Sequence, residues 1–159
     1  PGASALAVTA WDVLAGTVVP GQRVVVVGGG DVGCETAEFL AAQGRQVTVI
    51  EMLPTVAPEL MPWTQRLLVE RLLAAGVEIL LQARVMAIED TRVLYDRQGI
   101  LGQLAPVDSV VLACGVRPHN ELGEALRATG VPLHTVGDAL RPGNLADAIR
   151  SGYETGCLL

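Results

Sequence analysis

The chain has 159 residues, of which 50% are hydrophobic and 3% aromatic, and its formal net charge at pH 7 is -6. This length suits one domain with a sizeable core, and the apolar content favours a sheet that is buried on both faces. The acidic charge gives no basic footprint for phosphate backbones, and aromatic stacking platforms are scarce, so nucleic-acid binding is excluded as a leading function.

No apolar run approaches the roughly twenty residues of a membrane span, and the first ten residues lack the basic flank of a signal peptide. We therefore expect a cytoplasmic protein without a membrane partner. The three cysteines, Cys34, Cys114 and Cys157, form no C-x-x-C pair. Their spacing argues against a disulfide framework, a zinc site and a dithiol redox centre, so we expect the chemistry to come from a bound cofactor.

The chain begins without an initiator methionine, on an apolar segment that leads to Thr-Ala-Trp-Asp-Val-Leu at residues 9–14. We expect it to be a piece of a longer polypeptide.

A buried strand, Val24–Val27, then leads into a G-x-G-x-x-G fingerprint. Gly28 allows a tight turn, Gly30 lets the backbone approach a pyrophosphate, and Gly33 lets the helix pack on the strand. The helix expected over about Val32–Ala42 directs free N–H groups and roughly half a positive charge at the phosphates. The predicted phosphate loop consists of Gly28, Gly29, Gly30, Asp31, Val32 and Gly33.

Two residues of this segment have more than one interpretation. The charge of Asp31 opposes a pyrophosphate unless the side chain caps the helix or faces water, and capping is the favoured interpretation. Cys34, in the first helical turn, has either a thiol pKa lowered by the helix N-terminus or a packing role. Packing is favoured, because a free cysteine usually behaves as a small hydrophobic residue.

A second strand, Gln46–Ile50, ends on Glu51, at the spacing of about twenty residues expected for an acid that binds the adenosine ribose. A charge-assisted hydrogen bond there favours NAD(H) over NADP(H) by roughly one to two orders of magnitude. The alternative is an ordinary βαβ unit in which Glu51 is a solvated charge at the strand end.

The next predicted elements are a helix and a strand, followed by an antiparallel meander. A helix is predicted over Trp63–Ala75, because leucines recur at helical spacing, and a strand over Val77–Leu81. Alternating segments at 84–89, 92–95 and 100–104 predict an antiparallel meander. Residues 109–115 are typical of a buried parallel strand that ends at Gly115. Gly115 is therefore either a second nucleotide-site residue or a simple strand stop.

The last part of the chain changes in organisation. A helix over Glu121–Ala128, a strand over Leu133–Val136 and a helical tail over about Asn144–Leu159 are predicted. These roughly forty residues are too few for a domain with its own core. The two histidines, His119 and His134, have no partners at metal-ligand spacing, so both are interpreted as structural or exposed. No catalytic residue and no metal site are expected.

This order of elements, with Glu35 extending the fingerprint to G-x-G-x-x-G-x-E, resembles the pyridine-nucleotide domain of two-dinucleotide-domain flavoproteins. A closer resemblance is to the C-terminal region of the iron–sulfur flavoenzymes that include 2,4-dienoyl-CoA reductase, trimethylamine dehydrogenase and NADH oxidases. The matching stretches are residues 9–16, 26–38, 50–52, 115–122 and 136–139. The resemblance implies an α/β, Rossmann-like FAD/NAD(P)-binding fold, a parallel sheet with helices and an antiparallel meander, plus a remnant of an FAD domain.

In that family the nucleotide domain is inserted into an FAD domain. The resemblance therefore implies a linker from a missing FAD half-domain at 1–20, an NAD(H)-binding domain at 21–118 and a returning FAD segment at 119–159. Gly137 and Asp138 match a late flavin-contacting motif, for which the alternative is a glycine-terminated strand followed by an Asp helix cap.

The function implied is hydride transfer from NADH to FAD. FMN and an iron–sulfur cluster are implied as well, but outside this chain, in missing FAD and barrel domains of the same polypeptide. The fragment alone is then expected to be inactive. Two alternatives remain open: FAD itself bound on the Gly28 loop, and a non-catalytic module for nucleotide sensing or assembly.

Overall fold

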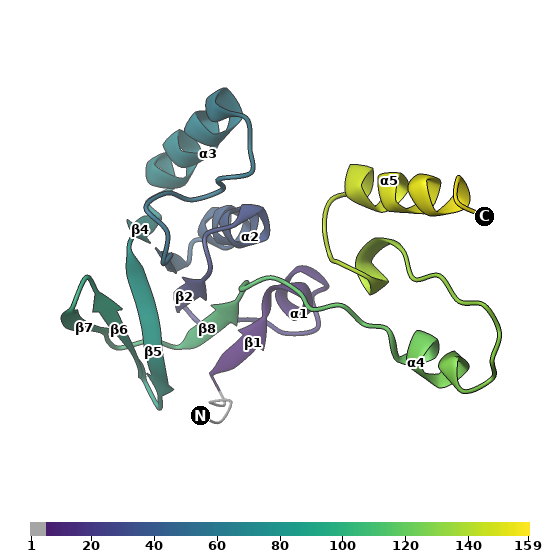
Figure 1. Cartoon of the computed structure of the whole chain (residues 1–159). Coiled ribbons are helices and arrows are strands. Elements are labelled where there is room, and N and C mark those ends of the chain that lie inside the picture. Colours follow the sequence, from purple (N-terminus) through teal and green to yellow (C-terminus); the bar gives the residue numbers. More distant parts are fainter. Residues whose placement is uncertain (1–5) are drawn as a thin grey trace. The chain divides into compact units, whose positions relative to one another are not determined.

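The computed structural model describes residues 6–159, and their contacts divide the chain into one unit that ends at Gly115 and a second that covers Val116–Leu159 (Figure 1). This division lies close to the domain end predicted at Pro118. It leaves the segment predicted as a linker in the first unit, although residues 1–5 of that segment lie outside the described part. The origin of the linker and of the second unit in an FAD domain stays a prediction.

The centre of the first unit is a five-stranded parallel sheet. Its strands, in spatial order, are β1 (Ala7–Thr9), β8 (Ser109–Leu112), β2 (Arg23–Val27), β3 (Gln46–Ile50) and β4 (Glu78–Leu80). In the middle of the sheet, Val26 pairs with Val49 and Val111, and all three are fully buried. The continuous valine run of β2 is explained by this position, because a parallel strand covered on both faces has no solvent side.

Helices cover one face of this sheet. They are α1 (Ala10–Leu14), α2 (Asp31–Ala42) and α3 (Pro62–Ala74). Leu40 of α2 and Leu72 of α3 belong to one buried cluster with Val26 of the sheet. The apolar positions of each helix recur at helical spacing, so they form the stripe that packs on the strands.

An antiparallel meander covers the other face. Its strands are β5 (Ala83–Glu89), β6 (Arg92–Arg97) and β7 (Ile100–Leu104). Val93 of β6 packs in a second buried cluster with Val25 and Val110, which point away from the helices. The predicted meander is confirmed, and the first unit therefore has three layers: helices, parallel sheet and meander.

Sequence patterns missed β1 and α1, in a segment where only a linker was expected. β1 has three residues, none of them buried, and its partner β8 lies about a hundred residues later, so no local alternation announces the pairing. The helix start did leave a signal. The Thr9 hydroxyl accepts a hydrogen bond from the Asp12 N–H at 3.1 Å, which is a side-chain cap.

The second unit consists of α4 (Glu121–Arg127), a 3-10 turn η1 (Gly137–Ala139) and α5 (Leu145–Gly156). Both predicted helices are confirmed, and the Asn144 side chain caps α5 in a capping box with Asp147. The strand predicted over Leu133–Val136 is wrong, because the described part of this unit contains no other strand with which it could pair. Of the residues from 116 to 159, only Gly123 is buried.

Candidate nucleotide-binding site

The candidate site lies where three neighbouring strands of the first unit end. The phosphate loop follows β2, Glu51 follows β3, and Gly115 lies in the segment after β8. Carboxyl ends of parallel strands meet at one edge of a sheet, and this edge is where open α/β sheets bind ligands. The structure thus brings together the glycine loop, Glu51 and the segment around Ala113. Gly137 and Asp138 lie in the other unit.

Two glycines of the loop are required by close backbone contacts. Gly28 has φ +102°, and a Cβ atom there would lie 2.5 Å from the carbonyl oxygen of Ala113. A Cβ atom on Gly33 would overlap the carbonyl oxygen of Gly28, where α2 packs against the end of β2. These are the tight turn and the close helix–strand packing that the fingerprint predicts.

Gly30 has the opposite environment. A Cβ atom there would meet nothing within 4 Å, so the loop is open on that side. Gly30 is also the N-cap of α2, and no side chain in the described part of the chain caps this helix. The first N–H groups of a helix have no intrahelical partners, and together with the helix dipole they attract anions. The arrangement fits a pyrophosphate lying over the N-terminus of α2.

Glu51 is buried, with 8% of its surface exposed. One carboxylate oxygen, Oε2, accepts a hydrogen bond from the Gly29 N–H at 2.6 Å, and Oε1 accepts one from the Leu53 N–H at 2.7 Å. The alternative interpretation of Glu51 as a solvated charge at the strand end is therefore wrong. Each oxygen has a second lone pair, so the carboxylate can still accept hydrogen bonds from ribose hydroxyls.

Asp31 does not cap the helix, so that expectation is wrong. Gly30 occupies the N-cap position and Asp31 is the first helical residue. Its Oδ1 atom is buried and has no hydrogen-bond partner among the described residues. The negative charge sits at the positive end of the helix dipole, which is favourable, and it stands beside the loop that would receive a phosphate.

The two cysteines near the site are poor nucleophiles. Cys34 is fully buried, its thiol donates to the Gly29 carbonyl oxygen at 3.4 Å, and burial raises its pKa to about 11. The packing role is confirmed and the lowered pKa is wrong. The thiol of Cys114 donates to the Val27 carbonyl oxygen at 3.3 Å, and burial raises its pKa too. Cys114 directly precedes Gly115, in the strand end that the sequence predicts at this edge of the sheet.

Gly115 has φ +83°, a conformation that favours glycine, and a Cβ atom there would meet nothing within 4 Å. β8 ends at Leu112, so Gly115 does not itself stop the strand. Its role as a nucleotide-site residue stays a prediction.

In the second unit, Gly137 has φ +60° and its N–H donates to the Ser151 hydroxyl at 2.8 Å. Asp138 is exposed and accepts a hydrogen bond from the Gly143 N–H at 3.3 Å. No strand directly precedes this pair in the described second unit, and Asn144 rather than Asp138 caps α5, so the alternative of a strand end and helix cap is wrong. The flavin contact stays a prediction.

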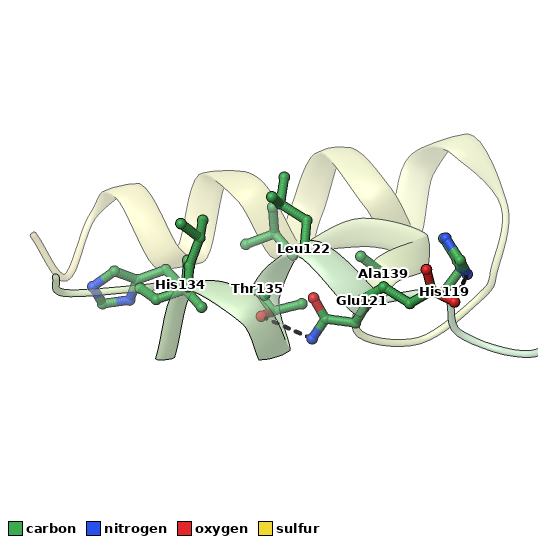
Figure 2. A pocket seen from close by; sticks show the side chains of 11 residues that line it. His119, Glu121, Leu122, His134, Thr135 and Ala139 are labelled. Atoms are coloured by element: carbon green, nitrogen blue, oxygen red, sulfur yellow. Dashed lines mark hydrogen bonds and ion pairs between the residues drawn. The ribbon is translucent and has the colours of Figure 1, made fainter. Parts of the chain in front are cut away.

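The second unit also has a shallow, largely apolar pocket of about 390 Å³ between α4 and the segment before η1 (Figure 2). His119 and His134 lie at opposite ends of its lining, and both are exposed, as predicted. Within the pocket, the Asn120 amide donates to the Thr135 hydroxyl at 3.4 Å. The lining offers little charge to hold a polar ligand.

Between residues 6 and 159, no three His, Cys, Asp or Glu side chains are placed to hold a metal ion. No helix in the same range is both long and apolar enough to cross a membrane.

The sequence profile of a family described as pyridine nucleotide-disulphide oxidoreductase matches residues 5–139. An NADH oxidase from Thermoanaerobacter brockii is 37% identical over 91% of this chain and 23% of its own length. A bilirubin reductase from Mediterraneibacter gnavus is 39% identical over 91% of this chain and 22% of its own length.

Among solved structures, a 6-hydroxypseudooxynicotine amine oxidase from Pseudomonas geniculata matches 96% of this chain with a TM-score of 0.84 and 26% identity. The match covers 24% of that protein. The chain therefore spans about a quarter of the length of the relatives and of the solved protein that it matches.

Proposed function

Because the chain belongs to the pyridine nucleotide-disulphide oxidoreductase family, we propose that its first unit binds NADH and, within a longer flavoenzyme, presents the nicotinamide to FAD. The observation that carries this proposal is the buried Glu51 carboxylate bonded to the glycine loop beside the uncapped N-terminus of α2. The loop supplies a cradle for a pyrophosphate, and Glu51 supplies the acceptor for the adenosine ribose.

Glu51 also favours NADH over NADPH in this proposal. The ribose hydroxyls donate to the carboxylate, whereas a 2′-phosphate there meets a like charge. The next residue is Met52, which is 66% exposed and offers no positive charge to neutralise such a phosphate. A lost charge-assisted hydrogen bond is worth about 1.5 to 3 kcal/mol, so we expect a preference of roughly ten- to a hundredfold.

The second unit is proposed to be the returning segment of an FAD domain, with residues 1–20 as the outgoing segment and 21–118 as the inserted nucleotide domain. Its exposed apolar side chains and the greater length of the relatives support this proposal. Gly137 and Asp138 would contact the flavin, and Gly115 the nicotinamide nucleotide. The bound FAD would accept the hydride, while this chain's residues bind and orient the nucleotide, so no acid or base is assigned.

The resemblance to 2,4-dienoyl-CoA reductase and trimethylamine dehydrogenase extends the proposal beyond this chain. Electrons would pass through an iron–sulfur cluster to FMN, both held by domains that this chain does not include. We expect the chain alone to be inactive. A cytoplasmic location also stays a prediction.

The test is a fluorescence titration of the purified 159-residue chain with NADH and with NADPH, alongside Glu51→Gln. We expect a colourless protein that quenches NADH fluorescence, binds NADPH at least tenfold more weakly, and loses most of that discrimination in the variant. A yellow protein that binds no NADH contradicts the proposal and favours FAD on the Gly28 loop. Equal binding of both nucleotides removes Glu51 from its role in discrimination.

A distinct outcome would favour a sensing or assembly module. In that outcome, the chain is joined to the segments that its longer relatives have in addition, and the product binds NADH tightly but does not reduce flavin.

A further inference from the structure

The segment from Glu51 to Ala57 holds both polar groups of the Gly29 backbone. The Gly29 N–H donates to the Glu51 carboxylate at 2.6 Å, and the Gly29 carbonyl oxygen accepts the Ala57 N–H at 2.7 Å. Gly29 stands between the glycine of the tight turn and the glycine that faces open space. A change in the backbone dihedral angles of Gly29 would therefore change the direction in which the N–H groups of the phosphate loop point.

Ala57 reaches this position only through an unusual backbone conformation. Its φ is +45°, in the left-handed region that residues with a Cβ atom seldom adopt, and its side chain is fully buried. Val56, also buried, packs directly over the loop, since a Cβ atom on Gly29 would lie 2.7 Å from its Cγ1 atom. Strained residues persist where the surroundings over-determine them, and they cluster at ligand sites.

The surroundings that hold this turn include one side chain of α3. The Gln65 Nε2 group donates to the Val56 carbonyl oxygen at 2.6 Å and to the Thr55 hydroxyl at 3.0 Å. A continuous set of hydrogen bonds thus runs from α3, through the turn at residues 55–57, to the Gly29 backbone.

We infer that Gln65 and the Ala57 turn are positioning residues of the nucleotide site, which hold the phosphate loop in its binding conformation before the nucleotide arrives. The inference rests on the proposed NADH function, because it assigns a purpose to the loop geometry. Gln65 bonds to the turn rather than to the loop, so its effect passes through Ala57 and Gly29. A loop already ordered loses less entropy on binding, which raises affinity without a new contact.

The test compares Gln65→Met with Gln22→Met in the full chain. The second variant is a matched control, because the Gln22 side chain also donates to one backbone carbonyl, that of Gly44 at 2.6 Å, away from the loop. Two quantities are measured: the NADH dissociation constant, and the hydrogen-exchange rates of the Gly29 and Val26 amides by NMR. Val26 lies in the central strand β2 and reports global opening.

We expect Gln65→Met to raise the dissociation constant about fivefold and to speed exchange at Gly29, with Val26 unchanged, while Gln22→Met stays within about twofold on each measure. A purely structural role for Gln65 would speed both amides together in Gln65→Met and also in the milder variant Gln65→Asn, and that result overturns the inference. Unchanged affinity and unchanged Gly29 exchange overturn it as well.

If Gln65→Met loses the protection of Val26, Gln65→Asn takes its place, since it keeps an amide on a shorter side chain. The two proposals fail separately. A wild-type chain that binds no NADH contradicts the proposed function, whereas a wild-type chain that binds NADH and is insensitive to Gln65 contradicts only this inference.

Discussion

The two units of this chain differ in how they bury apolar residues. The first has two buried clusters, one on each face of its parallel sheet, whereas in residues 116–159 only Gly123 is buried. Both carry a glycine with positive φ in a predicted cofactor motif, Gly28 and Gly137. Similar motifs therefore differ in support: Gly28 lies on a packed framework, whereas Gly137 lies beside helices whose apolar faces are exposed.

The largest expected effect on the free energy of unfolding comes from replacing Gly28 with alanine, and the same change at Gly137 serves for comparison. In Gly28→Ala the Cβ atom would meet the Ala113 carbonyl oxygen at 2.5 Å, so backbone strain and overpacking together should cost about 4 kcal/mol. Gly137→Ala is also strained, at φ +60°, but its nearest atom is the Ala148 Cβ at 3.6 Å and Gly137 lies in the second unit, so the unfolding of the first unit should not change. Urea denaturation of both variants measures the free energy of unfolding, and equal losses would show that the two glycines are equally important to the first unit.

A second pair tests the cores. Leu40→Ala removes a fully buried side chain of α2 and should lower the free energy of unfolding by about 3 kcal/mol. Leu145→Ala removes a side chain of α5 that is 77% exposed and should change it by less than about 0.5 kcal/mol. Thermal unfolding distinguishes the two. A large loss in Leu145→Ala would show that α5 is covered in solution.

A third prediction concerns pH. Asp108 accepts hydrogen bonds from the Arg23 backbone and side chain, which lowers the pKa of its carboxyl to about 2. Because the folded pKa lies below the unfolded one, the contribution is present above about pH 4 and is lost as the pH falls toward 2. Acid titration of unfolding should show this loss in the wild type and a weaker one in Asp108→Asn. Identical pH profiles of unfolding in the wild type and Asp108→Asn would show that the Arg23–Asp108 pair does not cause the loss of stability in acid.

The smallest effect is expected at Asp31. Its carboxylate stands beside the phosphate loop, so Asp31→Asn should strengthen NADH binding about threefold by removing a like charge. Glu35→Gln, on an exposed position of the same helix, is the control and should change affinity less. Raising the salt concentration should shrink the difference. Weaker binding in Asp31→Asn would mean that this carboxylate supports the loop.

Sequence patterns predicted an element well where the residues of that element alone determine its structure. The valine run of β2 and the apolar stripe of α2 needed no distant information. β1 was missed because its partner is remote, and the strand at 133–136 was wrongly predicted because apolar residues alone do not supply a partner strand. The helix cap was misassigned because Gly30, not Asp31, occupies the N-cap position.

In the candidate site, too, the features set by local sequence could be predicted, and those set by distant contacts could not. Glycine spacing and the place of Glu51 could be predicted, since both follow from the backbone geometry of a βαβ unit. The burial of Glu51 and its bond to Gly29 could not, because they depend on how the segment after β3 folds back over the loop. Gln65 gave no signal at all, since a glutamine on an amphipathic helix is ordinarily a surface residue.

The pairing of β1 with β8 has a consequence for how such a unit could be inserted into another protein. The first and last strands of the unit are neighbours in the sheet, with Ala7 opposite Val110 (Figure 1). The points of entry and exit are therefore separated by about one short strand, roughly 10 Å. Because these two ends lie close together, a host protein could accept a unit with this strand pairing within one surface loop.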